Sequence, residues 1–225
     1  MIGVLEAEAR KLATTRSALW LTLTVAVLAL GLAAMSQDPL LGVANFGVPV
    51  LMILSALTVT GEYRTAMIRT TFLATPRRAR VLAAKALVAA VFSAVLAAAM
   101  TAGSIVVAGS GRWASVSAVA FYAATGALLA VGVGALLRHT AAAVAVLLLV
   151  PFVVEPMLSV NTDIGDTVGP LLPFVNAAAF TGGSIFGFLH NFSMWWGPQG
   201  SALYFGGVAL GIFAAAVVVV ARRDP

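Results

Sequence analysis

Long apolar runs separated by short polar segments make up most of the chain. An α-helix rises about 1.5 Å per residue, so roughly 20 apolar residues cross the hydrocarbon core of a bilayer. Six runs approach or reach this length, and the pattern therefore predicts a single all-α, polytopic membrane domain over residues 1–225. The predicted spans cover residues 17–35, 43–60, 86–108, 117–137, 140–156 and 202–221, the fifth being the shortest.

The composition agrees with lipid as the solvent, because 61% of the 225 residues are hydrophobic and 9% are charged. Soluble domains carry about 25% charged residues. The composition therefore excludes a soluble enzyme, a disordered chain and a secreted disulfide scaffold. Cysteine is absent, which excludes disulfides, thiolate metal sites and thiol nucleophiles. The net charge of +5 does not predict nucleic-acid binding, since Lys and Arg in membrane proteins mostly record orientation.

The positive charges lie almost entirely on one side of the predicted bundle. Twelve of the 13 Lys and Arg residues fall on the side that carries both termini, and only Arg112 falls on the other. The positive-inside rule then places both termini in the cytoplasm. The first apolar run is too long for a cleavable signal peptide. We expect a multi-pass protein of the cell membrane, and the Ala-, Val- and Arg-rich composition favours a bacterial source.

Residues 1–16 predict an amphipathic helix on the cytoplasmic surface. Four apolar residues recur at helical spacing: Ile2, Leu5, Ala9 and Leu12. The charged residues lie largely off that stripe: Glu6, Glu8, Arg10 and Lys11. Two interpretations stay open, namely a connecting helix that contacts a partner and a polar lead-in that sets the topology.

The connection between the second and third spans, residues 61–85, holds six of the twelve cytoplasmic cations. Residues 62–74 contain no Pro or Gly and predict a short helix, which Pro76 ends or bends. Such a helix between two rigid spans would act as a lever that docks on a cytoplasmic partner. The alternative is a solvated basic loop that only fixes the topology.

Between the fifth and sixth spans, residues 157–200 are too many for a turn and too apolar for an exposed loop. Two runs, 168–181 and 184–196, are each too short to cross a bilayer, and Gly182 and Gly183 separate them. The pattern favours a pair of re-entrant external helices over one additional span.

Known catalytic and nucleotide-binding motifs are missing. Neither Lys11 nor Lys85 follows a glycine-rich loop, so the phosphate loop GxxxxGK[ST] is excluded. His139 and His190 fall on opposite sides and cannot share a metal. We therefore expect no enzymatic activity, no metal and no cofactor in this chain itself. The near absence of charge within the spans argues against ion-coupled transport and favours a pathway for a hydrophobic or amphiphilic compound.

Glu155, near the outer end of the fifth span, is the ionisable residue closest to the membrane interior. It shares roughly one helical face with Leu148 and Phe152, and Pro151 and Pro156 should bend this helix. Glu155 is either a carboxylate facing a pathway or one solvated at the interface, and the solvated interpretation is favoured.

Two segments resemble a known family. The loop GEYRTAMIRTTFLATPRRARVLAAKAL is similar to the segment after the second span in bacterial permeases of the ATP-binding-cassette (ABC) type-2 exporter family. The N-terminal EARKLATTRSALW resembles the E-x-x-K-L-x-[TS]-x-R-[ST]-x-x-W start common in that family. The order of surface helix, six spans, long second connection and apolar external segment extends the resemblance over the chain.

The resemblance implies the permease subunit of an ATP-driven exporter for efflux of a drug, lipid or natural product. Two separate ABC ATPase subunits would bind ATP and Mg, and a second permease would complete a homodimer or heterodimer. Seven residues would couple the chain to the ATPase: Glu62, Tyr63, Arg64, Arg69, Thr70, Phe72 and Leu73. Six residues of the second and fifth spans would line the transport pathway: Asn45, Pro49, Met52, Leu148, Phe152 and Glu155. The alternative function is an ATP-independent secondary transporter or channel-like protein.

Overall fold

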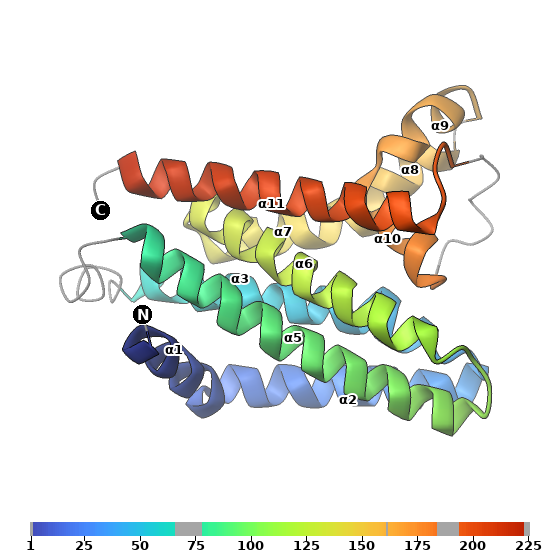
Figure 1. Ribbon diagram of the computed structural model, residues 1–225, viewed down its shortest axis with the longest axis horizontal. Helices are drawn as coiled ribbons and strands as arrows, with labels where there is room; N and C mark the ends of the chain where they lie inside the picture. Colours follow the sequence, from blue (N-terminus) through green and yellow to red (C-terminus); the bar gives the residue numbers. More distant parts are fainter. Residues whose placement is uncertain (1, 66–77, 161, 184–193, 223–225) are drawn as a thin grey trace.

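The computed structural model describes residues 2–65, 78–160, 162–183 and 194–222, and every regular element in these ranges is helical (Figure 1). The first half of the chain forms α1 (Ile2–Thr14), α2 (Arg16–Ser36), the π-helical turn η1 (Val43–Gly47), α3 (Val48–Arg64) and α5 (Arg78–Ala108). The second half forms α6 (Ala114–Leu137), α7 (Thr140–Leu149), the π-helical turn η2 (Val150–Val154), α8 (Glu155–Val160), α9 (Thr162–Val168), the 3₁₀ turn η3 (Gly169–Leu171), α10 (Pro173–Thr181) and α11 (Pro198–Arg222).

Six helical stretches within the described residues are long and apolar enough to cross a membrane, which confirms the predicted all-α class and the number of spans. They are Arg16–Ser36, Val43–Arg64, Ala79–Ala108, Ala114–Leu137, Thr140–Ser159 and Pro198–Arg222. The structure therefore has the element content of a multi-pass membrane protein.

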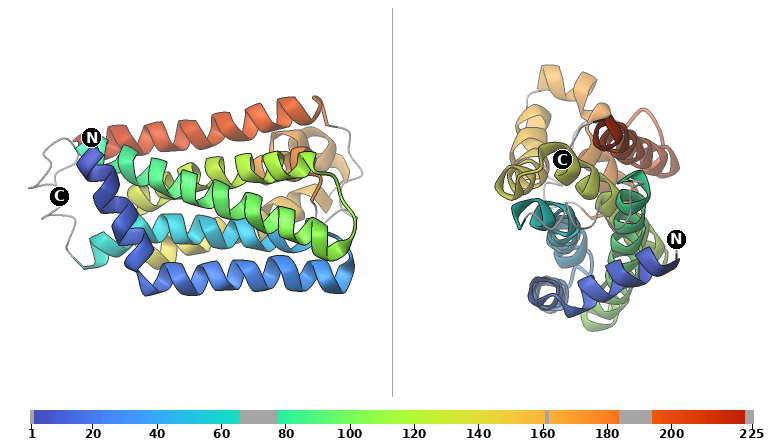
Figure 2. Two further views of the ribbon diagram at one scale, coloured as in Figure 1. Left: turned by 60° about the horizontal axis from the view of Figure 1, so that its bottom comes forward. Right: turned by 90° about the vertical axis from the view of Figure 1, so that its left-hand side faces the viewer.

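The six long helical stretches run roughly along one axis, and α1 and the last turn of α11 lie at the same end of the molecule (Figures 1 and 2). We call this the terminal end. There, α1 turns away from the direction of α2 and packs against α5. The connection between α5 and α6 and the segment α8–α10 lie at the opposite end.

Helix α6 lies at the centre of the bundle because its glycines let two neighbours approach closely. A Cβ atom at Gly134 would lie 3.1 Å from the carbonyl oxygen of Ala56 in α3. One at Gly132 would lie 3.1 Å from the Cα atom of Phe213 in α11. Small residues at helix contacts give close backbone packing in membranes, where no hydrophobic driving force separates protein from lipid.

The two π-helical turns each precede a proline. The N–H of Val48 bonds to the carbonyl of Val43 directly before Pro49, and that of Glu155 bonds to the carbonyl of Val150 directly before Pro156. A proline ring clashes with the carbonyl four residues earlier in a regular α-helix. That carbonyl belongs to Asn45 for Pro49 and lies within η1, so the wider turn accommodates the ring without breaking the span.

The connection after the second span is shorter than predicted. Helix α3 continues through Glu62, Tyr63 and Arg64, and α5 begins at Arg78, so Lys85 is helical as well. The polar side chains at these helix ends have partners in neighbouring helices, which lets the helices continue beyond the apolar runs. The remainder of the predicted coupling helix, residues 66–74, falls within the stretch 66–77 that lies outside the described residues.

In the external segment, the structure describes a helix within the first of the two predicted runs. Of the run 168–181, residues Pro173–Thr181 form α10, and Gly182 ends this helix with a positive φ of 78°, which glycine adopts without strain. Helix α10 packs against α11. Most of the run 184–196 lies outside the described residues, and residues 194–196 are not helical, so a re-entrant pair stays a prediction.

Gly42 provides a test of this packing. A Cβ atom there would clash with the carbonyl oxygen of Leu28, a backbone atom that cannot rotate away. We expect Gly42→Ala to lower the unfolding temperature of the detergent-purified chain, with an overpacking cost of about 1–3 kcal/mol.

Gly31→Ala is the matched control, because nothing lies within 4 Å of the added Cβ atom. It should leave the unfolding temperature unchanged or raise it, since Ala favours helix over Gly by about 1 kcal/mol. Equal effects of the two substitutions would contradict the close contact of α2 with the segment before η1.

Candidate functional site

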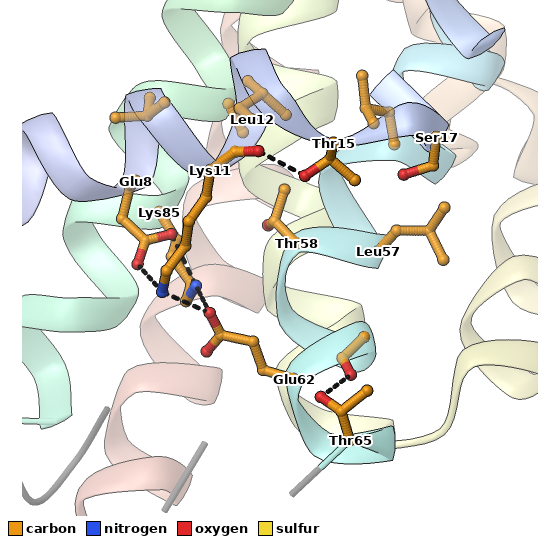
Figure 3. A pocket seen from close by; sticks show the side chains of 14 residues that line it. Glu8, Lys11, Leu12, Thr15, Ser17, Leu57, Thr58, Glu62, Thr65 and Lys85 are labelled. Atoms are coloured by element: carbon orange, nitrogen blue, oxygen red, sulfur yellow. Dashed lines mark hydrogen bonds and ion pairs between the residues drawn. The ribbon is translucent and has the colours of Figure 1, made fainter. Parts of the chain in front are cut away.

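Four charged side chains from three helices meet at the terminal end (Figure 3). Lys85 of α5 donates to Glu8 Oε2 of α1 and to Glu62 Oε1 of α3, each at 2.7 Å. Lys11 of α1 donates to the same Glu62 Oε1 at 2.9 Å and to Glu8 Oε1 at 3.2 Å. We call these four residues the charge network. Its two ammonium groups and two carboxylates balance in charge.

Burial differs across the charge network. Lys85 is 3% exposed and Glu8 6% exposed, whereas the Lys11 side chain remains 42% exposed. A cavity of about 290 Å³ adjoins the network, with walls that include Leu12, Leu54 and Val88. Lys85 and Glu8 thus form the enclosed side of the network, and Lys11 forms the side that meets solvent.

The electrostatics keep Lys11 charged. Its partial burial acts against the ammonium form, but hydrogen bonding to Glu62 and the charges of Glu62 and Glu8 outweigh this and raise the pKa of Lys11. One acceptor remains open: Glu62 Oε2 is buried and has no hydrogen-bond partner among the described residues.

The charge network corrects the predicted face of α1. Glu8, placed off the apolar stripe by the sequence pattern, is buried, whereas Ala9 of the predicted stripe is exposed. The inward face therefore runs through Glu8 and Leu12, which are buried, and Leu5, which is half-buried. Hydrophobicity alone cannot find this face, because Glu8 is buried through its ion pair with Lys85.

Pairing among the four residues was also not foreseen from sequence. Lys85 lies 77 positions from Glu8 and 23 from Glu62, so no local spacing connects them. The available signal was that Glu8 and Lys11 fall in the predicted cytoplasmic surface helix, and that Glu62 and Lys85 fall next to the cytoplasmic ends of two predicted spans. A buried charge requires a partner, and such residues are candidates for mutual pairing.

The predicted coupling residues fall into two groups. Glu62 belongs to the charge network, Tyr63 lies beneath the guanidinium of Arg138 at 5.3 Å from its ring centroid, and Arg64 is exposed at the end of α3. The other four lie outside the described residues: Arg69, Thr70, Phe72 and Leu73. The last turn of α3 therefore holds all the predicted coupling residues that the structure describes.

The predicted pathway residues of the second span differ in exposure. Pro49 is buried, and Met52 is 1% exposed and packs against α6 at Gly126, so both fill the core of a single chain. Asn45 is half-buried in η1, where its side-chain amide donates to the carbonyl of Leu41 at 3.3 Å. The half-buried stripe of this span is Phe46, Val50, Ile53 and Leu57.

The second and fifth spans touch at their π-helical turns. Phe46 of η1 stacks on Phe152 of η2, with ring centroids 6.1 Å apart and planes inclined by 14°. Leu148, on the same face as Phe152, is half-buried. The two irregular turns thus lie together.

The favoured interpretation that Glu155 is solvated at the interface is wrong. Its residue is 2% exposed, and its carboxylate accepts the backbone N–H groups of Phe174 at 3.0 Å and Val175 at 2.8 Å. These are N–H groups in the first turn of α10, which have no partner within their own helix. Glu155 caps α10, and the positive end of the helix dipole offsets its charge.

Comparison with protein-family models, curated proteins and solved structures finds no match to this chain. The site must therefore be interpreted from its own residues. Their arrangement provides a mechanical connection: α1 is held by ion pairs to the helix ends on both sides of residues 66–77.

Substitution of Lys85 tests the charge network. Lys85→Met leaves Glu8 and Glu62 facing each other with Lys11 as the remaining cation, and breaking a buried pair costs about 3–5 kcal/mol. We expect a clear fall in the unfolding temperature of the purified chain. Arg80→Met is the matched control, because Arg80 is an exposed cation on the same helix and should have little effect.

A double-mutant cycle separates pairing from packing. Glu8→Gln removes one of the two carboxylate partners of Lys85, and Lys85→Gln removes the nearer of the two ammonium partners of Glu8. Because both substitutions break the same Glu8–Lys85 pair, the double variant should lose less stability than the two single losses added together. Additive losses, or a Lys85→Met effect as small as that of Arg80→Met, would contradict the network.

Glu155→Gln tests the cap of α10. The glutamine amide offers one oxygen to two backbone N–H donors, and its NH₂ group faces a donor, at a cost of about 1.5–3 kcal/mol. Hydrogen exchange at the amides of Phe174 and Val175 should quicken. Asp166→Asn, at an exposed position, should leave these rates unchanged, and unchanged rates in Glu155→Gln would show that the carboxylate does not cap the helix.

Proposed function

We propose that this chain is the permease subunit of an ATP-driven exporter of the ABC type-2 kind, which moves a hydrophobic or amphiphilic compound across the cell membrane. Separate ATPase subunits, two in each complex, bind ATP and Mg, and a second permease copy completes the transporter. The termini and the charge network face the cytoplasm. The proposal rests on the residues of the chain itself, together with the family resemblance of its N-terminal and second connecting segments.

The charge network is the observation that carries the proposal. A partner that pushes on residues 66–77 delivers force to the helix ends at Thr65 and Arg78. Glu62 lies one turn from the first of these ends and Lys85 two turns from the second, and both are bound to α1. The force is therefore shared among α1, α3 and α5 instead of bending one helix end.

The contact of the second and fifth spans supports the same function. Their π-helical turns stack through Phe46 and Phe152, and π-turns are frequent at functional sites because they interrupt helix regularity. A pathway between these spans is lined by apolar and aromatic side chains. Such a lining suits a hydrophobic or amphiphilic substrate.

The placement of charge disfavours the alternative of an ion-coupled secondary transporter. Within the described spans, Glu62 and Lys85 are paired with each other at the terminal end, and both oxygens of Glu155 accept backbone hydrogen bonds. Ion-coupled transporters use embedded carboxylates or cation sites that exchange their ion. The carboxylates here are held by structural partners, so energy from a separate ATPase suits the chain better.

Site-specific crosslinking in native membranes tests the proposal. A photoreactive benzoylphenylalanine replaces Phe72 in the predicted coupling segment, and replaces Trp113, an exposed residue at the opposite end, in the control. We expect the Phe72 variant to capture a protein with a phosphate loop and an ABC signature motif, and the Trp113 variant not to capture it.

Energy dependence separates the two candidate functions. Uptake of a fluorescent hydrophobic dye into inverted membrane vesicles should require ATP and persist when a protonophore collapses the proton gradient. Uptake that survives ATP depletion but stops with the protonophore, together with identical crosslinks from the two positions, would favour the secondary transporter and contradict the proposal.

A further inference from the structure

A second cavity opens at the terminal end on the other side of α3, between its last turn and the connection from α6 to α7. It measures about 670 Å³. We call this cavity the arginine groove, and its polar lining residues are Thr60, Tyr63, Arg64, Arg138, His139 and Thr140. It shares no lining residue with the cavity beside the charge network.

The arginine groove carries positive charge without an acidic neighbour. Arg64 and Arg138 both line it, and none of the described residues that line it is Asp or Glu. The charge network, by contrast, balances each of its lysines with a carboxylate. The two arginines therefore attract an anion that the described chain does not itself supply.

Two polar atoms in this wall lack partners. Arg138 Nε and Thr140 Oγ1 are buried, and neither has a hydrogen-bond partner within the described part of the chain. A buried polar group left unsatisfied costs about 1–3 kcal/mol. Both residues line the groove, and an N–H donor and a hydroxyl that lack partners suit the oxygens of a phosphate group.

The backbone holds Arg138 in place. It ends α6 in the left-handed conformation with φ of 54°, its N–H bonds to the carbonyl of Gly134, and its guanidinium lies over the Tyr63 ring at 5.3 Å from the centroid. Non-glycine residues adopt this conformation rarely, so Arg138 occupies a position where Gly or Asn would fit with less strain. The guanidinium is thus positioned before any ligand arrives.

The start of α7 adds further donors. His139 caps this helix through Nδ1, which accepts the N–H of Ala142 at 3.3 Å, so in the neutral ring the hydrogen lies on Nε2. That nitrogen is available as a donor. The N-terminal end of a helix carries partial positive charge and favours anions.

An apolar surface continues from the groove along the fifth span. Ala145 lines the groove, and Leu149 and Val153 follow on the same face at helical spacing, 52% and 43% exposed. A soluble anion would gain nothing from these side chains, whereas an acyl chain would cover them. The arginine groove therefore offers a polar binding site for a headgroup, and Ala145, Leu149 and Val153 form an apolar track that leads away from it along the fifth span.

We propose that the arginine groove binds a phosphate-bearing anion, with Arg64, Arg138 and Thr140 holding the phosphate oxygens. The apolar track points to the headgroup of an anionic phospholipid in the leaflet at the terminal end, a type of contact that basic pockets between membrane helices make. Tyr63 and Arg64 also belong to the predicted coupling residues. Binding of an anion in the groove nevertheless requires neither an ATPase nor transport, so the site is tested independently of the proposed function.

Lipid binding to the full chain purified in dodecyl maltoside tests this site. Phosphatidylglycerol is the anionic probe, phosphatidylcholine the neutral control and sodium phosphate the free-anion arm, and binding is read by native mass spectrometry and by the shift in unfolding temperature. We expect the wild type to retain phosphatidylglycerol at least about tenfold more strongly than phosphatidylcholine, as for the gain of one charge-assisted contact.

Two variants and a control make the test specific. Arg138→Asn removes the guanidinium and tolerates the left-handed backbone, and Arg64→Gln removes an exposed charge. Each should weaken phosphatidylglycerol binding by about tenfold. Arg10→Gln removes an exposed cation of the same end outside the groove and should leave binding unchanged. If Arg138→Asn does not fold, Arg64→Gln carries the test.

The relative binding of phosphatidylglycerol, phosphatidylcholine and sodium phosphate distinguishes the possible ligands. Binding of phosphatidylglycerol without protection by sodium phosphate supports the site and identifies a lipid, and equal protection by both supports the site with a soluble phosphate as the ligand. Equal retention of the two lipids, or full binding by both groove variants, overturns the proposal. Binding of an acidic peptide in place of either phosphate probe would overturn it as well and assign the groove to a protein partner.

Discussion

The structure depends on one electrostatic constraint, namely that an ion at the edge of a bilayer must meet its counterion before it is buried. Lys85 lies within a helix that is long and apolar enough to cross a membrane, and its ammonium group is almost completely enclosed. Isolated, it would cost several kcal/mol of desolvation. Its two carboxylate partners come from α1 and α3, so burying one lysine fixes the positions of two further helices.

A similar constraint acts at the opposite end. Glu155 follows the π-helical turn of the fifth span, and its carboxylate is buried where α10 offers two unpaired N–H groups. Neither the helix end nor the carboxylate is satisfied alone in a nonpolar environment. The carboxylate supplies the acceptors that the N–H groups of α10 need, and these N–H groups supply the donors that the carboxylate needs. The short helix α10 is thereby attached to the fifth span, at a residue 19 positions earlier in the chain. Electrostatic pairing thus acts together with apolar packing to place the short helices α1 and α10.

The same distinction explains what the sequence could predict. Span number and helix class follow from the length of apolar runs, because the bilayer imposes a fixed thickness on every span. Pro151 and Pro156 predict a bend in the fifth span, although the choice of a π-turn there, and the π-turn before Pro49, need the three-dimensional fit. The burial of Glu8 and Glu155 could not be predicted, since a single-residue scale counts a carboxylate as solvent-seeking. A carboxylate becomes buried only when a partner group compensates its charge. For Glu8 and Glu155 that partner lies far away in the sequence, and the spacing of residues along the chain does not reveal such a pair.

The last turn of α3 brings these features together. Glu62 and Tyr63 are neighbours in sequence but point to different sides of the helix. Glu62 is bound to Lys11 and Lys85 on one side, and Tyr63 lies under Arg138 of the α6–α7 connection on the other. A rotation of this turn would change the contacts of α1 and α5 and those of α6 and α7 together. Because the turn leads directly into residues 66–77, a partner acting there would move both sides of the bundle through one rigid element. The charge network and the arginine groove therefore lie on two sides of the same turn of α3.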